Sequence, residues 1–404
     1  MSYRTAPQSR CWILLVLACA TVSLTWGQGQ SPKILGFKKQ FTIEIQNPSP
    51  ISLENRPIVL SVDEIRAFAP DFNSYNCAIF EEKGGGTQLV LSQADDLNKD
   101  RYHDEIVLIR TLPPNSTTQL TCYYSPTGNF QLMTTAKTSA RASSGPAPSV
   151  SWESNLCAFT FANGQIEPYG KLYPGLILQK TKSAETKPQE WGMALLDPDA
   201  SAGVGGLSLW DGKTRIPLLN LPGRKPLVIQ ETILARGPLR SLVRVDYSGI
   251  QGAKQEYQAV LLLSAFADSP VARIEVIVGA KADAKTGAPI LCGPGVRRLA
   301  DETLSSDPKK GYLAEWGRGV EGAGEIGLAV VFNPAEYAGL ADEGPDRWVE
   351  LAGTAGKKHT FWILSGWDKG LGAPGNPAGT NWGRRIEAAA EGLLVPVKVG
   401  YNAK

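Results

Sequence analysis

Histidine is nearly absent from this chain, whose 404 residues include only His103 and His359. A catalytic or structural zinc site usually draws on several imidazoles, and a Ser-His-Asp triad needs one imidazole held beside its serine. The sequence therefore argues against both classes of site.

Cysteine is also sparse, and the cysteines beyond the N-terminal segment show no CxxC or Cys/His metal pattern. These residues are Cys77, Cys122, Cys157 and Cys292. A disulfide between Cys77 and Cys122 is one interpretation if the protein is exported. Buried free thiols are the alternative, because a free cysteine packs as a small apolar side chain.

Neither sign of charge dominates. The chain has 41 Lys and Arg against 39 Asp and Glu, a net charge of +2, and the two signs are interspersed. A nucleic-acid partner would favour a basic face, and a strongly charged tail would indicate an electrostatic partner. The sequence shows neither, so no nucleic-acid partner is predicted.

The only long apolar run lies near the N-terminus, over residues 12–20 (WILLVLACA), after Arg4 and Arg10. A charged start, a short apolar middle and small residues before Gln28 are typical of a secretory signal, which we assign to residues 1–27. The run is shorter than the ~20 residues of a membrane span. We therefore expect a secreted or periplasmic protein without a transmembrane segment. A lipoprotein signal retaining a lipidated Cys19 is the alternative.

Most of the remaining chain consists of short alternating apolar runs separated by the 42 glycines and 28 prolines. Residues 41–45, 241–247 and 271–278 alternate strictly, a pattern that indicates half-buried antiparallel strands. We expect only a few short helices, one of them near residues 335–340. The sequence thus predicts an all-β protein.

About 375 residues beyond the signal are too many for one core and suggest two domains. Residues 134–149 (TTAKTSARASSGPAPS) are small and polar and contain proline, which is typical of a linker. We predict a small N-terminal β-sandwich over 31–133 and a larger C-terminal β-sandwich over 150–404, with a carbohydrate site in the larger domain.

An acidic loop lies between two strand-like runs. Its oxygen-bearing side chains alternate, and a backbone carbonyl is available between the last two of them. Calcium takes six to eight oxygen ligands, and this spacing wraps a loop around the ion. Arg101 stands where glycine usually permits the turn. The alternatives are a structural calcium site and a solvated hairpin loop. The predicted ligands are Asp96, Asn98, Asp100, Tyr102 and Asp104.

The same loop opens a series of blocks that resemble a bacterial family, the domain of unknown function 4861. Residues 93–107 are similar to its QvDDlDgDGxxDElvF signature, and the likeness extends from about residue 40 to the end of the chain. Further similar blocks follow in the family's order: WESN at 152–155, GVGG at 203–206, GPLR at 237–240, YLAEWG at 312–317, IGLAVV at 326–331 and SGW at 365–367.

The resemblance implies a place in bacterial polysaccharide degradation. It implies that the larger domain is a β-sandwich of the type shared by mutarotases and polysaccharide lyases. It also implies uronic-acid-containing oligosaccharides as substrates and lyase- or dehydratase-type elimination. Many family members carry His and Asp residues just before the GaGG block, but residues 190–199 of this chain contain no histidine. Catalysis is therefore in doubt.

Elimination beside a uronate carboxylate needs a group that neutralises the carboxylate, a base and an acid. We expect Tyr169, Lys171 and Glu153 to supply these groups without histidine. The predicted sugar-contacting residues are Trp152, Asn155, Tyr173, Trp316 and Arg318. For the tryptophans and Glu153, the alternative is core packing and a structural ion pair.

Three functions remain open from the sequence. The first is a secreted lyase or dehydratase, the second is a non-catalytic carbohydrate-binding protein, and the third is a glycoside hydrolase. Asp197 and Asp199 resemble the carboxylate pair that hydrolysis requires, although Pro198 between them also fits a turn.

Overall fold

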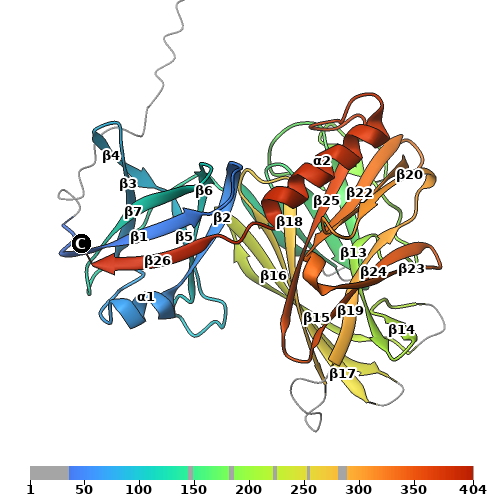
Figure 1. Ribbon diagram of the computed structural model, residues 1–404, viewed down its shortest axis with the longest axis horizontal. Coiled ribbons are helices and arrows are strands. Elements are labelled where there is room, and N and C mark those ends of the chain that lie inside the picture. The colour runs from blue at the N-terminus through green and yellow to red at the C-terminus, as the bar shows by residue number, and fades with distance from the viewer. Residues whose placement is uncertain are drawn as a thin grey trace, which may run out of the picture.

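The computed structural model describes residues 36–143, 149–181, 186–221, 225–252, 255–280 and 289–403. The predicted signal at 1–27 and the alternative anchor Cys19 lie outside this part of the chain. Strands dominate the described residues, so the all-β prediction is confirmed. Figure 1 shows two β-rich bodies joined side by side.

The smaller body is a sandwich of two antiparallel sheets. Its core receives alternate residues of the first strand, where Phe41, Ile43 and Ile45 are buried. The helix α1 (Val62–Phe68) directly follows the strand β2. The five-stranded sheet contains β26 (Lys398–Ala403), β1 (Lys39–Asn47), β7 (Ser116–Tyr124), β3 (Cys77–Lys83) and β4 (Gly86–Val90), in that order. The three-stranded sheet contains β2 (Leu53–Ser61), β6 (Glu105–Leu112) and β5 (Ser92–Asp95).

The larger body packs an eight-stranded sheet against two five-stranded sheets around one apolar core. The eight-stranded sheet runs β15 (Val228–Arg236), β16 (Arg240–Gln251), β17 (Glu256–Phe266), β18 (Val271–Ala280), β25 (Lys358–Trp367), β22 (Glu325–Phe332), β21 (Tyr312–Arg318) and β20 (Ala300–Asp307). One five-stranded sheet runs β12 (Gly192–Ala194), β11 (Gln165–Lys171), β10 (Ala158–Ala162), β9 (Ser149–Ser154) and β8 (Thr138–Ser143). The other runs β14 (Thr214–Pro217), β13 (Val204–Asp211), β19 (Pro289–Arg297), β24 (Asp346–Thr354) and β23 (Tyr337–Glu343).

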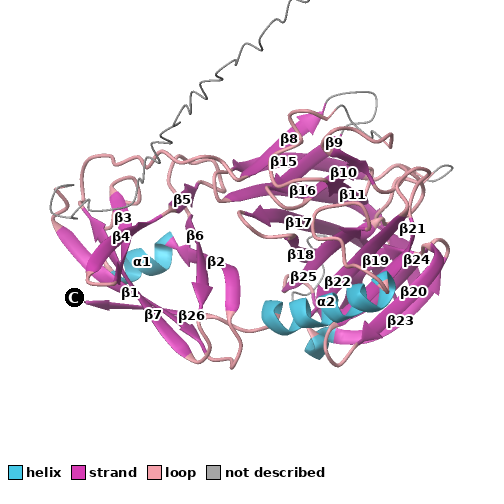
Figure 2. Cartoon of the chain, turned by 90° about the horizontal axis from the view of Figure 1, so that it is seen from above, coloured by secondary structure: helices cyan, strands magenta, loops and turns pink. Residues whose placement is uncertain are grey.

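The predicted domain boundaries differ from the structure at two places. The strand β8 lies inside the expected linker 134–149 and pairs with β9, so this stretch belongs to the larger sandwich. The last strand, β26, leaves the larger body and pairs with β1, with Phe41 opposite Ala403. Figure 2 shows this C-terminal segment running back to the smaller body. The smaller domain is therefore built from both ends of the chain.

One long helix was missed by the sequence pattern. The helix α2 (Ala378–Leu393) covers the outer face of β20, β21 and β22 through Trp382 and Ile386. Three glycines interrupt its sequence, and Pro377 at its N-cap forms no side-chain hydrogen bond, so the usual start signal is missing. Near residues 335–340 the structure has the short 3-10 helix η1 (Pro334–Glu336).

Cys77 and Cys122 lie on the neighbouring strands β3 and β7 and are free thiols. Burial, followed by a hydrogen bond with Cys77, raises the pKa of the Cys122 thiol. The structure thus agrees with the free-thiol alternative.

A buried polar network joins the two bodies. The guanidinium of Arg240, on β16 of the larger body, donates to Asp95 Oδ2 from Nε at 2.8 Å and from Nη2 at 2.5 Å. It also donates from Nη1 to Glu105 Oε2 at 2.7 Å. The side chain of Gln93 accepts from the backbone N–H groups of Leu239 and Arg240 and donates to the carbonyl of Arg240. We name Gln93, Asp95, Glu105 and Arg240 the interdomain clamp.

We predict that Arg240→Ala lowers the free energy of unfolding by about 3–5 kcal/mol, because it leaves the Asp95 carboxylate buried without its cation. Urea unfolding measures the change. The control is Arg244→Ala on the same strand, whose half-exposed guanidinium pairs with Asp246 and contributes about 1 kcal/mol or less. Equal effects of the two substitutions would contradict the clamp.

Candidate functional site

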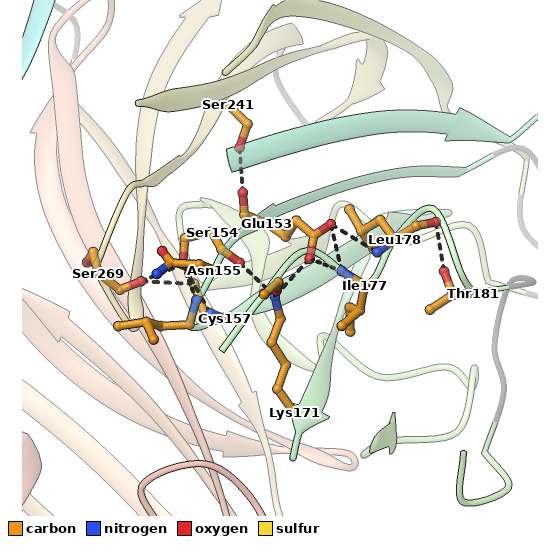
Figure 3. Close-up of polar contacts among 12 residues, drawn as sticks. Glu153, Ser154, Asn155, Cys157, Lys171, Ile177, Leu178, Thr181, Ser241 and Ser269 are labelled. Atoms are coloured by element: carbon orange, nitrogen blue, oxygen red, sulfur yellow. Dashed lines mark hydrogen bonds and ion pairs between the residues drawn. The ribbon is translucent and has the colours of Figure 1, made fainter. Parts of the chain in front are cut away.

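Glu153 and Lys171, two of the expected catalytic residues, form a buried ion pair with 0% and 1% of their side chains exposed. Lys171 Nζ lies 2.8 Å from Glu153 Oε2 and donates to the carbonyl oxygens of Ser154 and Gly175. Figure 3 shows these contacts converging on the lysine. The ammonium group thus has three protein acceptors and is closed to a substrate.

The carboxylate of Glu153 is equally occupied. Its two oxygens accept hydrogen bonds from the backbone N–H groups of Ile177 and Leu178, as Figure 3 shows. The pair thereby fixes the segment after β11 onto the strand β9. This geometry corrects the catalytic assignment, because both charged groups hold the fold together.

The other residues predicted around this pair are also structural or peripheral. Tyr169 is 3% exposed and its hydroxyl accepts from Thr160, while Trp152 is fully buried and stacks on Phe159. Asn155 exchanges two hydrogen bonds with Asp268, one from its amide and one to its amide oxygen. A buried Trp152 offers no ring face to a sugar.

The other predicted sugar-contacting residues are Tyr173 and, two residues apart on β21, Trp316 and Arg318. Tyr173 is 40% exposed, with Lys180 Nζ 5.7 Å from its ring centroid. Trp316 is buried beneath α2 and donates its indole N–H to Glu325. Arg318 is exposed and pairs with Asp301. Trp316 therefore offers no ring face to a sugar, and the guanidinium of Arg318 is already paired.

The acidic loop folds around its own backbone. The carboxylate of Asp96 accepts from the N–H groups of Lys99 and Arg101, and that of Asp104 accepts from Leu97 N–H. The side chains of Asn98 and Asp100 accept in the same way from N–H groups two residues on. Within the described ranges, no group of three His, Cys, Asp or Glu side chains is placed to hold a metal ion.

The arrangement that the sequence did not reveal centres on Glu167 of β11. Its side chain is buried, and Gln165 on the same face of the strand holds the loop that carries Asp197 and Asp199. Gln165 donates to Asp197 O and accepts from Asp199 N–H, both at 3.2 Å. Arg297 at the end of β19 pairs with Asp199 at 2.8 Å. We name Glu167, Asp197, Asp199 and Arg297 the carboxylate cluster.

Electrostatics in the carboxylate cluster favour a protonated Glu167. Burial, followed by the charges of Asp199 and Asp197, raises the pKa of Glu167 to about 7, against a smaller opposing effect of Arg297. Burial also raises the pKa of Asp199. A carboxyl group that titrates near neutral pH beside a second carboxylate and a cation can transfer protons.

A cleft of about 310 Å³ is lined mostly by the smaller body and borders the larger body at Gly237 and Pro238. His103 and Tyr75 line it with their rings 4.1 Å apart, and Phe130, Met133 and Pro238 close other sides. His103 Nδ1 is 3.1 Å from Ser74 Oγ. Burial lowers the pKa of His103, against the opposing charges of Asp95, Asp96 and Asp104. The lining mixes aromatic and polar groups, as small-molecule sites do.

A family model described as "Domain of unknown function (DUF4861)" matches residues 45–399. The chain belongs to the DUF4861 family. No curated protein gives a significant match.

Among solved structures, a protein in the glycosyl hydrolase family 38 from Enterococcus faecalis matches with a TM-score of 0.51 at 9% identity. The match covers 91% of this chain and 48% of that one. An α-mannosidase from Enterococcus faecalis V583 gives a TM-score of 0.44 at 9% identity, over 91% and 46% of the two chains. This DUF4861 chain thus spans about half the length of the solved proteins that it matches.

The sequence blocks that resemble DUF4861 have visible structural roles here. The first block supplies Gln93, Asp95 and Glu105, and the GPLR block supplies Arg240, so two distant blocks meet in the interdomain clamp. In the GVGG block, Gly203 has φ +65°, and a Cβ there would lie 2.0 Å from the carbonyl oxygen of Ile166. Only glycine lets β13 approach β11 this closely.

We predict that Lys171→Ala lowers the free energy of unfolding by about 3–5 kcal/mol, because Glu153 then stays buried without a counter-charge. Chemical denaturation tests this, with the exposed Lys180→Ala as a near-neutral control. Unchanged stability of Lys171→Ala, together with lost activity, would restore the catalytic assignment.

We predict that Glu167→Gln makes stability less dependent on pH. The native pKa of about 7 lies above the usual 4.5, so the stabilisation by Glu167 is complete below pH 4.5 and is lost as pH rises through 7. From pH 4.5 to 8 the native chain should lose on the order of 3 kcal/mol more than Glu167→Gln. Unfolding curves across this range provide the measurement, and parallel losses would refute the raised pKa.

Proposed function

We propose that this protein is a carbohydrate-active enzyme that acts on uronic-acid-containing oligosaccharides by elimination, with its chemistry at the carboxylate cluster. The observation that carries the proposal is the buried carboxyl group of Glu167, whose pKa is raised to about 7 by burial and then by the charges of Asp199 and Asp197, near the ion pair of Asp199 with Arg297. The solved protein of similar fold is described as a glycosyl hydrolase family 38 protein, which supports a carbohydrate as the ligand.

The cluster also coincides with a family feature. The loop bearing Asp197 and Asp199 ends the segment 190–199, where many DUF4861 members carry His and Asp residues. In this chain the buried Glu167 comes from a neighbouring strand to the same place. A carboxyl group with a pKa of about 7 has the acid strength of an imidazole, so Glu167 replaces the missing histidine chemically.

Three members of the carboxylate cluster have roles in the proposed reaction. The guanidinium of Arg297 binds the uronate carboxylate and stabilises the enolate that forms when the C5 proton leaves. The carboxylate of Asp199 takes that proton, and its raised pKa makes it a stronger base. The C4–O bond breaks with its electron pair on oxygen, and protonated Glu167 supplies the proton to this oxygen. Because Glu167 is only 3% exposed, this step requires the loop that carries Asp197 and Asp199 to move aside. The product carries a C4=C5 double bond, and solvent restores both carboxyl groups.

The same roles predict a bell-shaped pH profile. Asp199 must be ionised and Glu167 must be protonated, so activity should fall at acidic pH and again above about pH 7. Delivery to such a substrate agrees with the export signal expected at residues 1–27. No helix within the described ranges is long and apolar enough to span a membrane.

We predict that Glu167→Gln lowers elimination by about 100-fold or more, because it removes the titratable proton while keeping the shape of the side chain. Ultraviolet absorbance of the unsaturated product, over a panel of uronate oligosaccharides, measures the rate. The matched control is Glu231→Gln on the edge strand β15, whose pKa burial also raises. Full activity of Glu167→Gln would remove Glu167 from the site.

Non-catalytic sugar binding is the second candidate function, favoured by the interdomain cleft with its Tyr75–His103 pair. Binding by calorimetry without any absorbance change would support this candidate against elimination. Reducing ends released without unsaturation would instead support glycoside hydrolysis.

The proposal includes a structural calcium ion at the acidic loop. The ligand set of Asp96, Asn98, Asp100 and Asp104, with the backbone carbonyl of Tyr102, offers hard oxygen atoms at alternate positions. Arg101 adopts φ 76°, the left-handed conformation that glycine usually provides at this place, so the arginine does not prevent the turn. To bind calcium, the carboxylates would exchange their hydrogen bonds within the loop for the ion.

We predict that calcium raises the melting temperature and that a chelator reverses the shift, because the ion binds only the folded loop. Asp100→Ala should abolish the shift. Asp307→Ala is the control, since Asp307 accepts similar backbone hydrogen bonds in a hairpin turn. If calcium does not change the melting temperature, the acidic loop is a solvated hairpin loop and not a calcium site.

A further inference from the structure

A small pocket of about 70 Å³ lies at the junction of the two bodies, away from the carboxylate cluster. The smaller body contributes Arg56 from β2, and the larger body contributes Arg273 from β18. Phe266, Trp362 and Leu393 supply apolar walls. Two guanidinium groups thus line one small, largely apolar space.

Arg273 has few partners within the described residues. Its single ion pair joins Nη2 to Glu275 Oε2 at 3.5 Å, and Glu275 is also held by Lys358 at 2.8 Å. Arg273 Nε is buried without a hydrogen-bond partner. The guanidinium stacks on Phe266 at 5.1 Å, and 22% of the side chain is exposed. Its Nε donor is therefore unused among the described residues.

Arg56 faces the same pocket with its charge only partly compensated. It donates to the carbonyl oxygens of Gly392, Leu393 and Val395 at the end of α2, which are dipoles and not full charges. Burial and then the charge of Arg273 lower the pKa of Arg56. The charge of Arg240 acts on Arg273 in the same direction. Like charges thus meet where the two domains join.

We propose that this pocket binds a small tetrahedral oxyanion, sulfate or phosphate, between Arg56 and Arg273. Guanidinium groups pair with oxyanions through parallel N–H donors, so the anion satisfies the unused Nε donor of Arg273 and separates the two cations. The pocket volume limits the ligand to a small ion. Because the arginines come from different domains, the bound anion stabilises the junction. The inference is independent of the proposed elimination.

Calorimetry and thermal unfolding of the native chain test the site, with sodium sulfate, sodium phosphate and sodium acetate titrated at constant ionic strength against sodium chloride. We expect saturable binding of sulfate or phosphate at one site, competition between the two, and a higher melting temperature. Whichever of sulfate and phosphate binds more tightly identifies the class of anion that the pocket prefers. Absence of saturable binding, or acetate binding as tightly as both, overturns the proposal.

Two variants locate the binding. Arg273→Gln should weaken anion binding at least tenfold, and Arg273→Lys should weaken it by a smaller factor because lysine keeps the charge but loses the paired donors. Arg318→Gln, which removes an exposed arginine paired with Asp301, is the control and should bind as the native chain does. Native affinity in either Arg273 variant overturns the assignment. If Arg273→Gln does not fold, Arg273→Lys decides.

Discussion

Arg240 leaves the larger sandwich and ends on Asp95 and Glu105 of the smaller one, and the relative placement of the two bodies depends on this contact. The guanidinium is buried, so each of its hydrogen bonds must be made with well-placed oxygen atoms. Gln93 completes the network by accepting from the backbone N–H groups of Leu239 and Arg240 and donating to the carbonyl oxygen of Arg240. The interdomain cleft and the arginine-lined pocket both border the junction that this network fixes.

Much of the fold followed from alternation along the strands. Phe41, Ile43 and Ile45 face one core because successive side chains of a strand point to opposite faces, and such patterns are visible in the sequence. The helix α2 was missed because its apolar positions at Trp382, Ile386 and Ala390 are interrupted by glycines and begin without a capping side chain. The pairing of β26 with β1 could not be predicted either, because pairing between strands far apart in the sequence leaves no local pattern.

The site was harder to predict than the fold. The sequence places the charged residues Glu153 and Lys171 shortly after the expected linker, and Lys171 Nζ does lie 2.8 Å from Glu153 Oε2. Both side chains are buried, however, so their ion pair is a structural contact. Glu167 lies on β11 together with Lys171, but its local sequence gives no sign of its raised pKa. The raised pKa arises from burial and from Asp197 and Asp199, which a loop some thirty residues later brings close. The one local indication of this site was the alternation of Gln165 and Glu167, which places both polar side chains on one face of β11.

The strand β26 also has a consequence for biosynthesis. Residues 398–403 supply the edge that lies beside β1, so the first sandwich begun by the ribosome is finished by residues made more than 350 positions later. Until then β1 presents an open row of backbone donors and acceptors, which is a template for pairing with other chains. The edge of β1 therefore stays open to other chains until residues 398–403 are made, and loss of these residues would expose it again.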